Sequence, residues 1–539
     1  MAADLKRLPL SMPRFSTLRR ENRIYVDKTE LVFSLAEKNQ QFFLSRPRRF
    51  GKSLLVTTFA SLFQFGLRDF KGLAIEKLWK DTTYNVVRLD FSRVKNFGDS
   101  FEDFENKYRW MLANAFGKLG FVLRENTTEP IEEQLSAWME DQADGSLVLL
   151  VDEYDSPLTA CLHNPALFDR VQSRLADFYA QVKSNAGMLR FFFMTGITKM
   201  KQTGIFSEFT DLIDITLRSD YGTLLGYTEE EILSYFGDYI EDASLILRMK
   251  PSDVMQALRR NYDGYCFDDK VSSHVYTPWS VLNFLNCPGD GFRNYWFETG
   301  GISSSLINYF KSHALRDPAE FQDPKHLSRE VLAASTGLSA LSDVALLTQA
   351  GYLTIKDYRD GEFSLGYPNE EVKASMGALY SGMLLKGKTL SEVKAGNIVS
   401  LMAKDTPDAV ITGFNRMFMA LDYVRYPIID EAACRGYLQA MLCGAGVYAQ
   451  VEVHNALGRS DLEVDAGNRR WIFELKYLAA STAKSETLQT RLLAEAEKQI
   501  QSHRYGEQDV SGRELMRIAA VFSEKERQIV SWTTVPQQP

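Results

Sequence analysis

The chain has 539 residues, of which 45% are hydrophobic and 24% are charged, and its formal net charge is -8. This length exceeds what one hydrophobic core can organise, so roughly three or four domains are expected. The composition excludes a mostly disordered protein. The negative charge excludes a protein whose whole surface binds nucleic acid, so any such contact must be local.

Cysteine usage and hydrophobic runs point to the cytoplasm. The five cysteines are odd in number, widely spaced and never in a C-x-x-C pair, which indicates neither a disulfide framework nor a zinc ribbon. The N-terminus, MAADLKRLPLSMPRF, has no apolar segment, and no run of about 18 apolar residues occurs in the chain. We therefore expect no signal peptide, no membrane partner and a cytoplasmic location.

The first motif is RPRRFGKSL, at residues 46–54. An apolar run at 40–45 predicts a buried strand before it, and apolar side chains at helical spacing predict a helix over 53–63. Strand, loop and helix is the order of a phosphate-binding loop, in which backbone N–H groups, a lysine and a helix N-terminus converge on phosphate oxygens. Arg46 stands where such a loop usually has its first glycine, so a surface turn is the alternative interpretation.

Each part of this loop has an expected role. The ammonium of Lys52 would bridge phosphate oxygens and the hydroxyl of Ser53 would bind Mg²⁺, while two arginines add positive charge beside the anion. The predicted ATP-binding residues are Arg48, Arg49, Phe50, Gly51, Lys52, Ser53, Leu54, Asp152 and Thr195.

The last two of these residues come from later strands. Residues 147–151 form an apolar run that ends in Asp152 and Glu153. In ATPases the Asp holds the Mg²⁺ shell and the Glu orients or deprotonates the attacking water, although a strand that ends in Asp-Glu is also common as a structural feature. Another predicted strand, 188–196, carries Thr195 where related ATPases have a polar residue that senses the γ-phosphate.

The order of these elements predicts the first fold. A further strand is predicted at 84–92, and helical stretches at 101–116 and 166–182 separate the strands. Alternation of strands and helices is typical of a parallel sheet with helices on both faces.

From Gly222 onward the sequence predicts a helical region, with Thr228 as the expected N-cap of a lid helix. Its aromatic segments, 262–269, 276–285 and 294–301, are interpreted as packing, and no chemistry is assigned to them. Two alternating runs joined at Asp360 and Gly361 predict a hairpin that resembles the wing of a winged-helix fold. Its mixed charges favour a packing module or partner surface at least as much as DNA binding.

A second set of chemical groups lies near the C-terminus, where residues 448–478 predict alternating strands. Glu474 and Lys476 are two residues apart, so both side chains point to one face. With Asp461 from the neighbouring strand, Glu474 would bind Mg²⁺ or Mn²⁺ while Lys476 orients the water and stabilises negative charge. Glu431 is an additional candidate metal ligand. The alternatives are a decayed fold or a solvated charge pair, because this pattern also arises by chance.

Taken in series, the motifs resemble those of a known bacterial family. They are RPRRFGKSL, DEYD, TGITK, GYTEEE, YDGY, PWSVLNFL, NYW, GYPNEEV, GRSDLEV and FELK, followed by Gln499 and Tyr505. The chain resembles proteins that join an AAA-ATPase-like domain to a PD-(D/E)XK nuclease superfamily domain, in which the Arg-Arg-Phe form of the loop is usual. The resemblance implies the following site residues: Lys52 and Ser53 for nucleotide and Mg²⁺, Asp152 and Glu153 as the acidic pair, Asp461, Glu474 and Lys476 as the nuclease centre, and Glu431 or Glu452 as a less defined acidic position.

The predicted fold is therefore α/β. We expect an AAA-like P-loop ATPase core at 1–221, a helical lid and winged-helix-like region at 222–375, a helical linker at 376–430 and a PD-(D/E)XK nuclease-like domain at 431–539.

The predicted function is an ATP-dependent or ATP-gated nuclease that uses ATP and Mg²⁺. Its expected partner is nucleic acid, and DNA is favoured over RNA. The chain is also a candidate for forming a homo-oligomer. The alternative is a nucleotide-switch protein whose nuclease-like domain binds nucleic acid or a partner without cutting. The nearly balanced charge of residues 451–539 favours this alternative.

Overall fold

The computed structural model describes residues 5–125, 127–199, 211–298, 324–328, 331–332, 343–454, 457–481, 486–506 and 513–537. The chain divides into two compact units, one formed by the described residues up to Asn369 and the other by those from Glu370 onward. Within these ranges, no helix combines the length and the apolar character needed to cross a bilayer.

The first unit is built on a parallel sheet of five strands in the order β2-β3-β4-β1-β5. The strands are β1 (Gln41–Ser45), β2 (Asn85–Asp90), β3 (Leu147–Asp152), β4 (Leu189–Gly196) and β5 (Ile213–Asp214). Every residue of β3 is buried, as expected for an inner strand covered on both faces. The four strands predicted from the sequence are confirmed, and β5 is an addition that no sequence pattern indicates.

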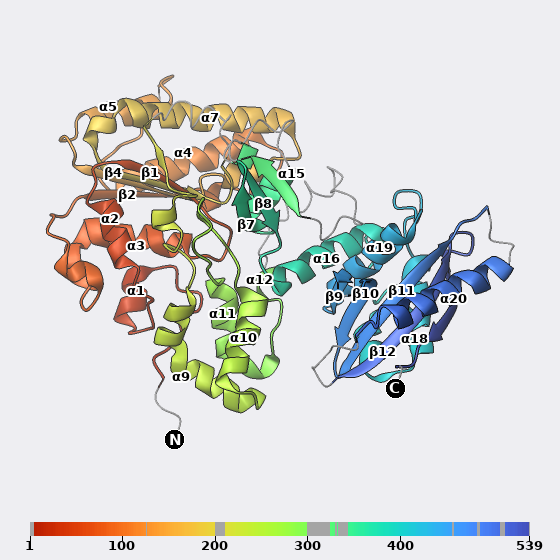
Figure 1. The fold of residues 1–539 in the computed structure, drawn as a ribbon. Coiled ribbons are helices and arrows are strands. Elements are labelled where there is room, and N and C mark those ends of the chain that lie inside the picture. Colours follow the sequence, from red (N-terminus) through yellow and green to blue (C-terminus); the bar gives the residue numbers. More distant parts are fainter. Residues whose placement is uncertain are drawn as a thin grey trace. The chain divides into compact units, whose positions relative to one another are not determined.

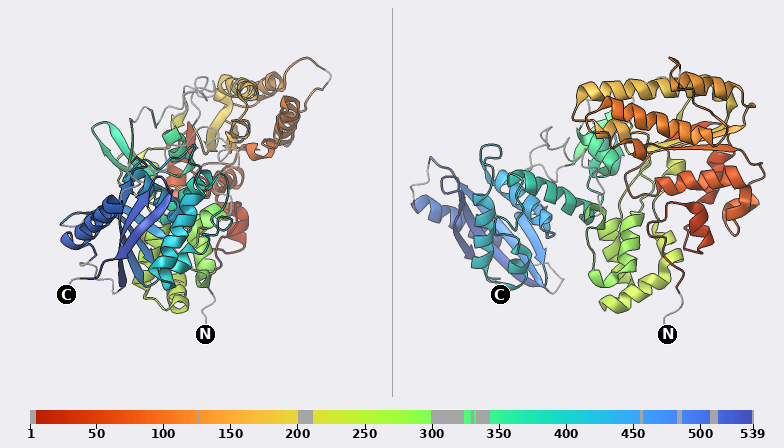
Figure 2. Two further views of the ribbon diagram at one scale, coloured as in Figure 1. Left: turned by 90° about the vertical axis from the view of Figure 1, so that its right-hand side faces the viewer. Right: turned by 180° about the vertical axis from the view of Figure 1, so that it is seen from behind.

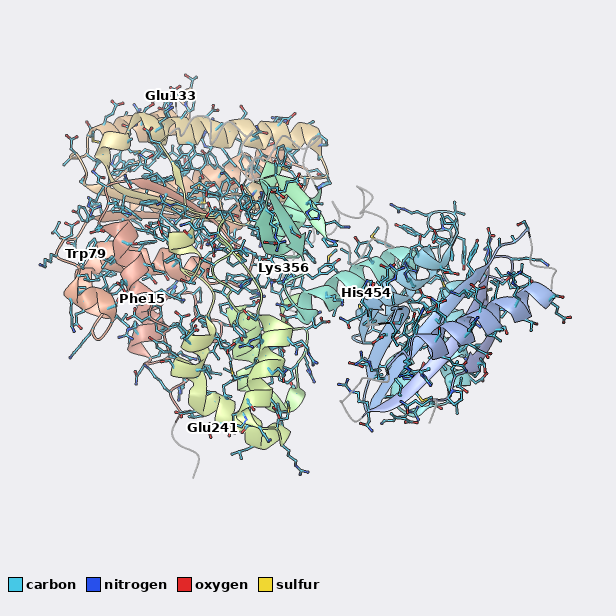
Figure 3. All side chains as sticks on the ribbon, in the orientation of Figure 1. Phe15, Trp79, Glu133, Glu241, Lys356 and His454 are labelled. Atoms are coloured by element: carbon cyan, nitrogen blue, oxygen red, sulfur yellow. The ribbon has the colours of Figure 1, made fainter. Side chains whose placement is uncertain are left out.

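Helices cover both faces of this sheet (Figures 1 and 2). One layer contains α1 (Phe15–Arg20), α2 (Thr29–Ala36) and α3 (Lys52–Phe65), and the other contains α4 (Phe101–Gly117), α5 (Ile131–Glu140) and α7 (Pro165–Ser184). The short α6 (Ser156–Ala160) follows β3. Figure 3 shows Phe15 among packed side chains in the first layer and Glu133 on the outer surface of the second. This layering is the α/β architecture expected from the sequence.

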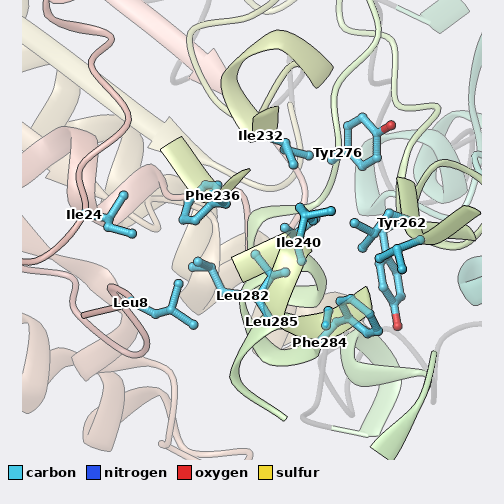
Figure 4. Packing of buried hydrophobic residues seen from close by; sticks show 14 of the residues in the cluster. Leu8, Ile24, Ile232, Phe236, Ile240, Tyr262, Tyr276, Leu282, Phe284 and Leu285 are labelled. Carbon is cyan, nitrogen blue, oxygen red and sulfur yellow. The ribbon is translucent and has the colours of Figure 1, made fainter. Parts of the chain in front are cut away.

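Three further helices form a bundle with its own core (Figure 4). They are α9 (Glu229–Leu247), α10 (Pro251–Tyr262) and α11 (Pro278–Asn286), and α12 (Tyr295–Glu298) follows them. Thr228 is the N-cap of α9, as predicted, and completes a capping box with Glu231. Leu8 and Ile24, from the N-terminal segment, pack into the same core. The start of the chain and the lid helices are therefore one packed body.

A small antiparallel sheet, in the order β6-β8-β7, completes the first unit. Its strands are β6 (Lys325–Ser328), β7 (Thr354–Arg359) and β8 (Glu362–Gly366), and α15 (Asp343–Ala350) precedes the hairpin. Asp360 and Gly361 both have positive φ angles, of 53° and 86°, which the tight two-residue turn requires. The predicted hairpin is thus confirmed.

The second unit contains a mixed sheet in the order β13-β12-β11-β10-β9, in which only β11 and β12 run parallel. Its strands are β9 (Tyr448–His454), β10 (Arg459–Ala466), β11 (Arg469–Leu478), β12 (Glu514–Ser523) and β13 (Gln528–Thr534). Its helices are α16 (Glu370–Leu384), α17 (Ile398–Lys404), α18 (Pro407–Met419), α19 (Glu431–Gly444) and α20 (Glu486–Ser502). Ala496 and Ile500 of α20 pack on Ile472 of β11 and Ala519 of β12, so α20 covers the centre of the sheet.

Candidate nucleotide and nuclease sites

The segment between β1 and α3 folds around the ammonium of Lys52. Its Nζ donates hydrogen bonds to the carbonyl oxygens of Arg46 and Pro47, both at 2.9 Å. Arg49 and Gly51 have φ angles of 71° and 96°, so the chain turns sharply before α3 begins. The loop thus places a lysine beside a helix N-terminus, the combination that binds phosphate groups.

A cavity of about 480 Å³ opens at this loop. All seven predicted loop residues, Arg48 to Leu54, line it. The remaining walls come from the N-terminal segment around Tyr25 and from lid residues that include Leu225 and Trp279. A partly apolar cavity of this size with a few convergent polar groups is typical of small-molecule sites.

Arg46 points into the protein interior instead of the cavity. Its guanidinium donates to the carbonyl oxygens of Ser45, Thr216 and Tyr221, at 2.9, 2.7 and 3.2 Å, and lies 4.4 Å over the ring of Phe267. The side chain is only 1% exposed. Arg46 therefore holds the loop to the segments after β5, which explains physically how the loop keeps its shape without the usual first glycine.

Two neighbouring loop side chains contact the aromatic segments of the lid. The ring of Phe50 lies edge to face with those of Tyr265 and Phe267, at 4.8 and 5.1 Å. The guanidinium of Arg49 lies 4.1 Å over the ring of Trp279. One segment interpreted as packing, 276–285, thus forms part of the cavity wall through Trp279, which the sequence analysis missed. The motif PWSVLNFL, singled out in the family resemblance, was the available signal.

The segment before the hairpin also touches the loop. Gly351 has a φ of 90°, and a Cβ at this position would lie 2.6 Å from that of Pro47. The carbonyl oxygen of Gly351 accepts a hydrogen bond of 2.9 Å from the hydroxyl of Tyr265. Only glycine fits this close approach, so the loop has contacts with the lid and with the hairpin region.

Asp152, at the end of β3, is almost fully buried beside Ser53. Burial raises the pKa of Asp152 to about 6, and a hydrogen bond from Ser53 opposes this shift. Its Oδ1 has no hydrogen-bond partner within the described ranges. An orphaned carboxylate oxygen beside a hydroxyl fits Mg²⁺, which accepts one or two protein ligands and takes its others from water and phosphates.

Glu153 and Thr195 occupy different surroundings. Glu153 has a positive φ of 49°, lines the cavity and accepts a hydrogen bond of 3.0 Å from Ser156. Thr195 is fully buried, and its hydroxyl donates to the carbonyl oxygen of Leu44 at 2.7 Å. The structure therefore brings Glu153 to the cavity but engages Thr195 within the sheet, and its contact with nucleotide stays a prediction.

Asp155 has a structural role that the sequence did not assign. Its carboxylate accepts hydrogen bonds from the backbone N–H groups of Ile197 and Thr198 and from the Thr198 hydroxyl, the last at 2.6 Å. These bonds fix the chain as it leaves β4, next to the loop.

The second site forms where β10 and β11 lie side by side. Asp461 of β10 accepts a hydrogen bond of 2.8 Å from the backbone N–H of Leu475, between the two predicted residues of β11. Nζ of Lys476 donates to Glu474 at 3.0 Å and to the side-chain oxygen of Gln499 on α20 at 2.9 Å. The three predicted nuclease residues are thus brought together.

The charges of this site are strongly coupled. Burial and the charge of Asp461 raise the pKa of Glu474 to about 7. Burial lowers the pKa of Lys476, but the charge of Glu474 opposes this, and the pKa of Lys476 is raised overall. Glu474 is 1% exposed, and its Oε2 has no hydrogen-bond partner in the part of the chain that the structure describes.

These residues form a partial ligand set for a metal ion. Across the described ranges, no three His, Cys, Asp or Glu side chains are arranged to hold a metal by themselves. Mg²⁺ usually keeps several waters and needs only one or two carboxylates. Asp461 and the orphaned oxygen of Glu474 therefore fit Mg²⁺ or Mn²⁺ when water and a substrate phosphate supply the other ligands.

Glu431 is the first residue of α19 and reaches the same strand. It accepts a hydrogen bond of 3.3 Å from the backbone N–H of Tyr477. Burial raises the pKa of Glu431, and the charge of Lys476 opposes this shift. The structure thus places Glu431 beside the predicted nuclease residues.

Arg435 is a site residue that the sequence analysis missed. Its guanidinium lies 3.3 Å from Asp461 and also forms an ion pair with Glu452, which Arg459 contacts at 3.1 Å. Arg435 follows Glu431 by four residues on α19, so both point to one helix face, and this spacing was the available signal. Of the two less defined acidic residues, Glu452 is thus engaged by arginines.

Comparisons with known proteins match the two regions that contain these sites to two different families. Residues 9–206 match the family model described as predicted AAA-ATPase, and residues 429–532 match the model described as PD-(D/E)XK nuclease superfamily. A similar protein of Azotobacter chroococcum mcd 1, named as an uncharacterized protein in the vnfD 5' region, is 28% identical over 488 residues, which cover 89% of this chain and 90% of the relative. The chain combines an N-terminal domain of the AAA-ATPase-like family with a C-terminal domain of the PD-(D/E)XK nuclease superfamily.

Proposed function

We propose that this protein is an ATP-gated, metal-dependent nuclease that cuts phosphodiester bonds in nucleic acid, DNA in the first place. The observation that carries the proposal is the convergence of Asp461, Glu474 and Lys476 on adjacent strands, with a buried carboxylate oxygen left without a partner within the described ranges. The cavity around Lys52, in the same chain, supports the dependence on ATP.

In this proposal each nuclease residue has one task. Asp461 and Glu474 hold Mg²⁺ or Mn²⁺, which when bound stabilises negative charge on the phosphate and on the attacking oxygen. The raised pKa of Lys476 keeps it protonated, so it acts as a fixed positive charge that orients water and stabilises the transition state. Gln499 holds the ammonium of Lys476 in position.

The ATPase residues are assigned in the same way. Lys52 and the loop N–H groups bind the phosphates, Ser53 and Asp152 hold Mg²⁺, and Glu153 orients the attacking water. Because the loop contacts Trp279 and Phe267, filling the cavity would shift the lid, which is the proposed basis of gating. The corresponding domains are the AAA-like ATPase core at 1–221, the helical lid and winged-helix-like region at 222–375, a helical linker at 376–430 and the nuclease-like domain at 431–539.

Cleavage of labelled single- and double-stranded DNA and RNA tests the proposal. Parent, Lys52→Ala and Glu474→Ala proteins are incubated with Mg²⁺ or Mn²⁺, with and without ATP. We expect ATP-stimulated cutting by the parent, loss of the stimulation in Lys52→Ala and loss of cutting in Glu474→Ala. Lys77→Ala and Glu495→Ala, at exposed positions outside both sites, are the matched controls. Parental cutting that ignores ATP would overturn the gating, and absence of cutting on every substrate would overturn the nuclease.

A nucleotide switch that binds nucleic acid without cutting is the second candidate, and one observation favours it. Arg435 contacts both Asp461 and Glu452, so a guanidinium occupies space beside the carboxylate that a metal would need. If the protein is such a switch, neither the parent nor Arg435→Ala will cut with Mn²⁺, although both retain nucleic acid. Cutting by Arg435→Ala alone would identify Arg435 as an inhibitory contact on a working nuclease.

A further inference from the structure

A basic groove lies over β2, the edge strand of the parallel sheet, between α1, α3 and α4. Its volume is about 510 Å³. We define the basic groove by its cationic lining residues, which are Arg14, Arg20, Arg68, Arg88, Arg93 and Lys118. Asp90 is the carboxylate among its lining residues. We propose that the basic groove binds single-stranded nucleic acid.

Arg68 and Arg93 pair with Asp69 and Asp90, at 3.0 and 3.5 Å, and the other charges of the groove are available to a ligand. Arg14, Arg88 and Lys118 are exposed, and no described carboxylate lies within ion-pair distance of any of them. The groove thus gathers six cations and one carboxylate on a protein whose net charge is -8. All but one of the six cations are arginines, whose planar guanidinium groups bind phosphate through two parallel hydrogen bonds. The ligand expected from this charge is a phosphate polymer.

Two exposed aromatic rings favour a single strand of nucleic acid over a duplex as the ligand of the groove. Trp110 of α4 is 60% exposed and Phe65 of α3 is 40% exposed, and both line the groove. The guanidinium of Arg68 lies 3.7 Å over the ring of Phe65. Bases of a single strand can stack on such rings, whereas a duplex keeps its bases inside. An acidic peptide would match the charges but would bring no bases to stack on the rings.

The groove and the nucleotide cavity share three stretches of chain. Arg14, Thr57 and Arg93 line the groove, and residues one or two positions away, Pro13, Thr58 and Lys95, line the cavity. The hydroxyl of Thr57 donates to the carbonyl oxygen of Pro13 at 2.7 Å and accepts from the N–H of Phe15 at 3.1 Å. A strand bound in the groove would therefore displace backbone that also forms the ATP site.

This inference goes beyond the proposed function, because binding in the groove needs neither metal nor cleavage. It is tested in the full-length Glu474→Ala protein, with EDTA and without ATP, by fluorescence anisotropy of a labelled oligothymidylate over a series of salt concentrations. The Glu474→Ala protein is the parent in this experiment, and three variants are compared with it. The first carries Arg14→Gln, Arg88→Gln and Lys118→Gln, the second carries Trp110→Ala, and the control carries Lys77→Gln, Lys250→Gln and Arg260→Gln at exposed positions outside the groove.

The groove triple variant should bind about tenfold more weakly or worse, and the slope of log K against log salt should fall by about 2, at about 0.7 for each lost phosphate contact. Trp110→Ala should weaken binding about fivefold or more, because one stacked base is lost. The control should bind like the parent. On adding oligothymidylate, hydrogen exchange should slow in β2 and α4, and the affinity for ATP should change in the parent but not in the groove triple variant.

Three results would overturn the proposal. The first is a groove triple variant that is folded by circular dichroism and binds like the parent. The second is a duplex with the same number of phosphates, or polyglutamate of equal charge, that binds as tightly as the single strand. The third is protection from hydrogen exchange confined to the nuclease unit. None of these results depends on whether the nuclease cuts, so the groove and the proposed function succeed or fail separately.

Discussion

The guanidinium of Arg46 lies 4.4 Å over the ring of Phe267, which ties the loop between β1 and α3 to a segment far along the chain. The same ring lies 5.1 Å from Phe50, the loop residue that precedes Gly51. The loop is thus held at its entrance and near its end by one aromatic side chain. An arginine at the place of the usual glycine is a requirement of this architecture, because it supplies contacts that a glycine lacks.

Arg46→Gly should therefore weaken the site, although it restores the usual loop sequence. The change removes the three hydrogen bonds of a buried guanidinium and leaves the carbonyl oxygens of Thr216 and Tyr221 without these donors. We expect a loss of about 3 kcal/mol or more in the free energy of unfolding and weaker binding of ATP, measured by urea denaturation and calorimetry. Arg46→Lys keeps the charge but has fewer hydrogen-bond donors. Its free energy of unfolding and its affinity for ATP should lie between those of the parent and those of Arg46→Gly. Parental stability and affinity in Arg46→Gly would contradict this account.

Trp279 should report on nucleotide in the cavity. Its ring lies 4.1 Å from the guanidinium of Arg49 and forms part of the wall. We expect Trp279→Ala to weaken ATP binding by about 2- to 30-fold, the range of one cation–π contact, and Trp279→Phe to lose less. The tryptophan fluorescence of the parent should change on adding ATP, and this change should be absent in Trp279→Phe. Equal affinity in all three proteins would place the nucleotide elsewhere in the cavity.

The framework of the first unit was predictable because its signals are local. Buried strands such as β3 are short apolar runs, and the loop and acidic residues directly follow them. The hairpin followed from Asp360 and Gly361, whose positive φ angles suit that turn. The strand β5 has two residues and therefore no pattern to recognise.

The cavity walls and the groove could not be predicted, because they depend on contacts between distant segments. Trp279 meets Arg49 only after the lid has packed, and the six cations of the basic groove are scattered over residues 14–118. Thr195 is a further example. Its place at the end of β4 agrees with the prediction, but its hydroxyl donates to the carbonyl oxygen of Leu44 on β1, a contact between distant segments that the sequence does not reveal.

Glu132 should make the stability of the first unit depend on pH. Its carboxylate is buried, accepts a hydrogen bond of 2.7 Å from Tyr108 and pairs with Arg174 at 3.1 Å. Burial raises the pKa of Glu132, and the bond from Tyr108 and the charge of Arg174 only partly oppose this. Because the folded protein holds the proton more tightly than the unfolded chain does, this stabilisation is present at low pH and is lost as pH rises through the folded pKa.

Glu132→Gln removes this titration while keeping the shape of the side chain. Arg174 retains its other partner, Glu105, at 2.7 Å. Urea denaturation from pH 4 to pH 7 should show the Gln variant gaining stability relative to the parent as pH rises. The exposed neighbour Glu133, changed to Gln, is the control and should show no such trend. A pH-independent difference between Glu132→Gln and the parent would contradict the prediction.

Substitutions of Lys476 and Gln499 should separate two effects in the proposed nuclease centre, the positive charge itself and the hydrogen bond that positions it. Lys476 supplies the positive charge beside Glu474, so Lys476→Ala should lower the single-turnover cleavage rate by about 100- to 1000-fold at saturating Mg²⁺. Gln499→Ala leaves the charge but removes the hydrogen bond of 2.9 Å that fixes it, so we expect a smaller loss, about tenfold. Glu495→Ala, exposed on the same helix, is the control.

The affinity for Mn²⁺, measured by calorimetry, distinguishes the two roles from metal binding. Neither Lys476 nor Gln499 is assigned as a ligand, so the affinity should stay close to parental in Gln499→Ala and should rise in Lys476→Ala, because a positive charge beside Glu474 is lost. Glu474→Ala should abolish both binding and cutting. If Gln499→Ala cuts at the parental rate, the hydrogen bond to Lys476 serves folding alone. If Lys476→Ala cuts at the parental rate, a group other than Lys476 must orient the water. The neighbouring Arg435 is then the first residue to substitute.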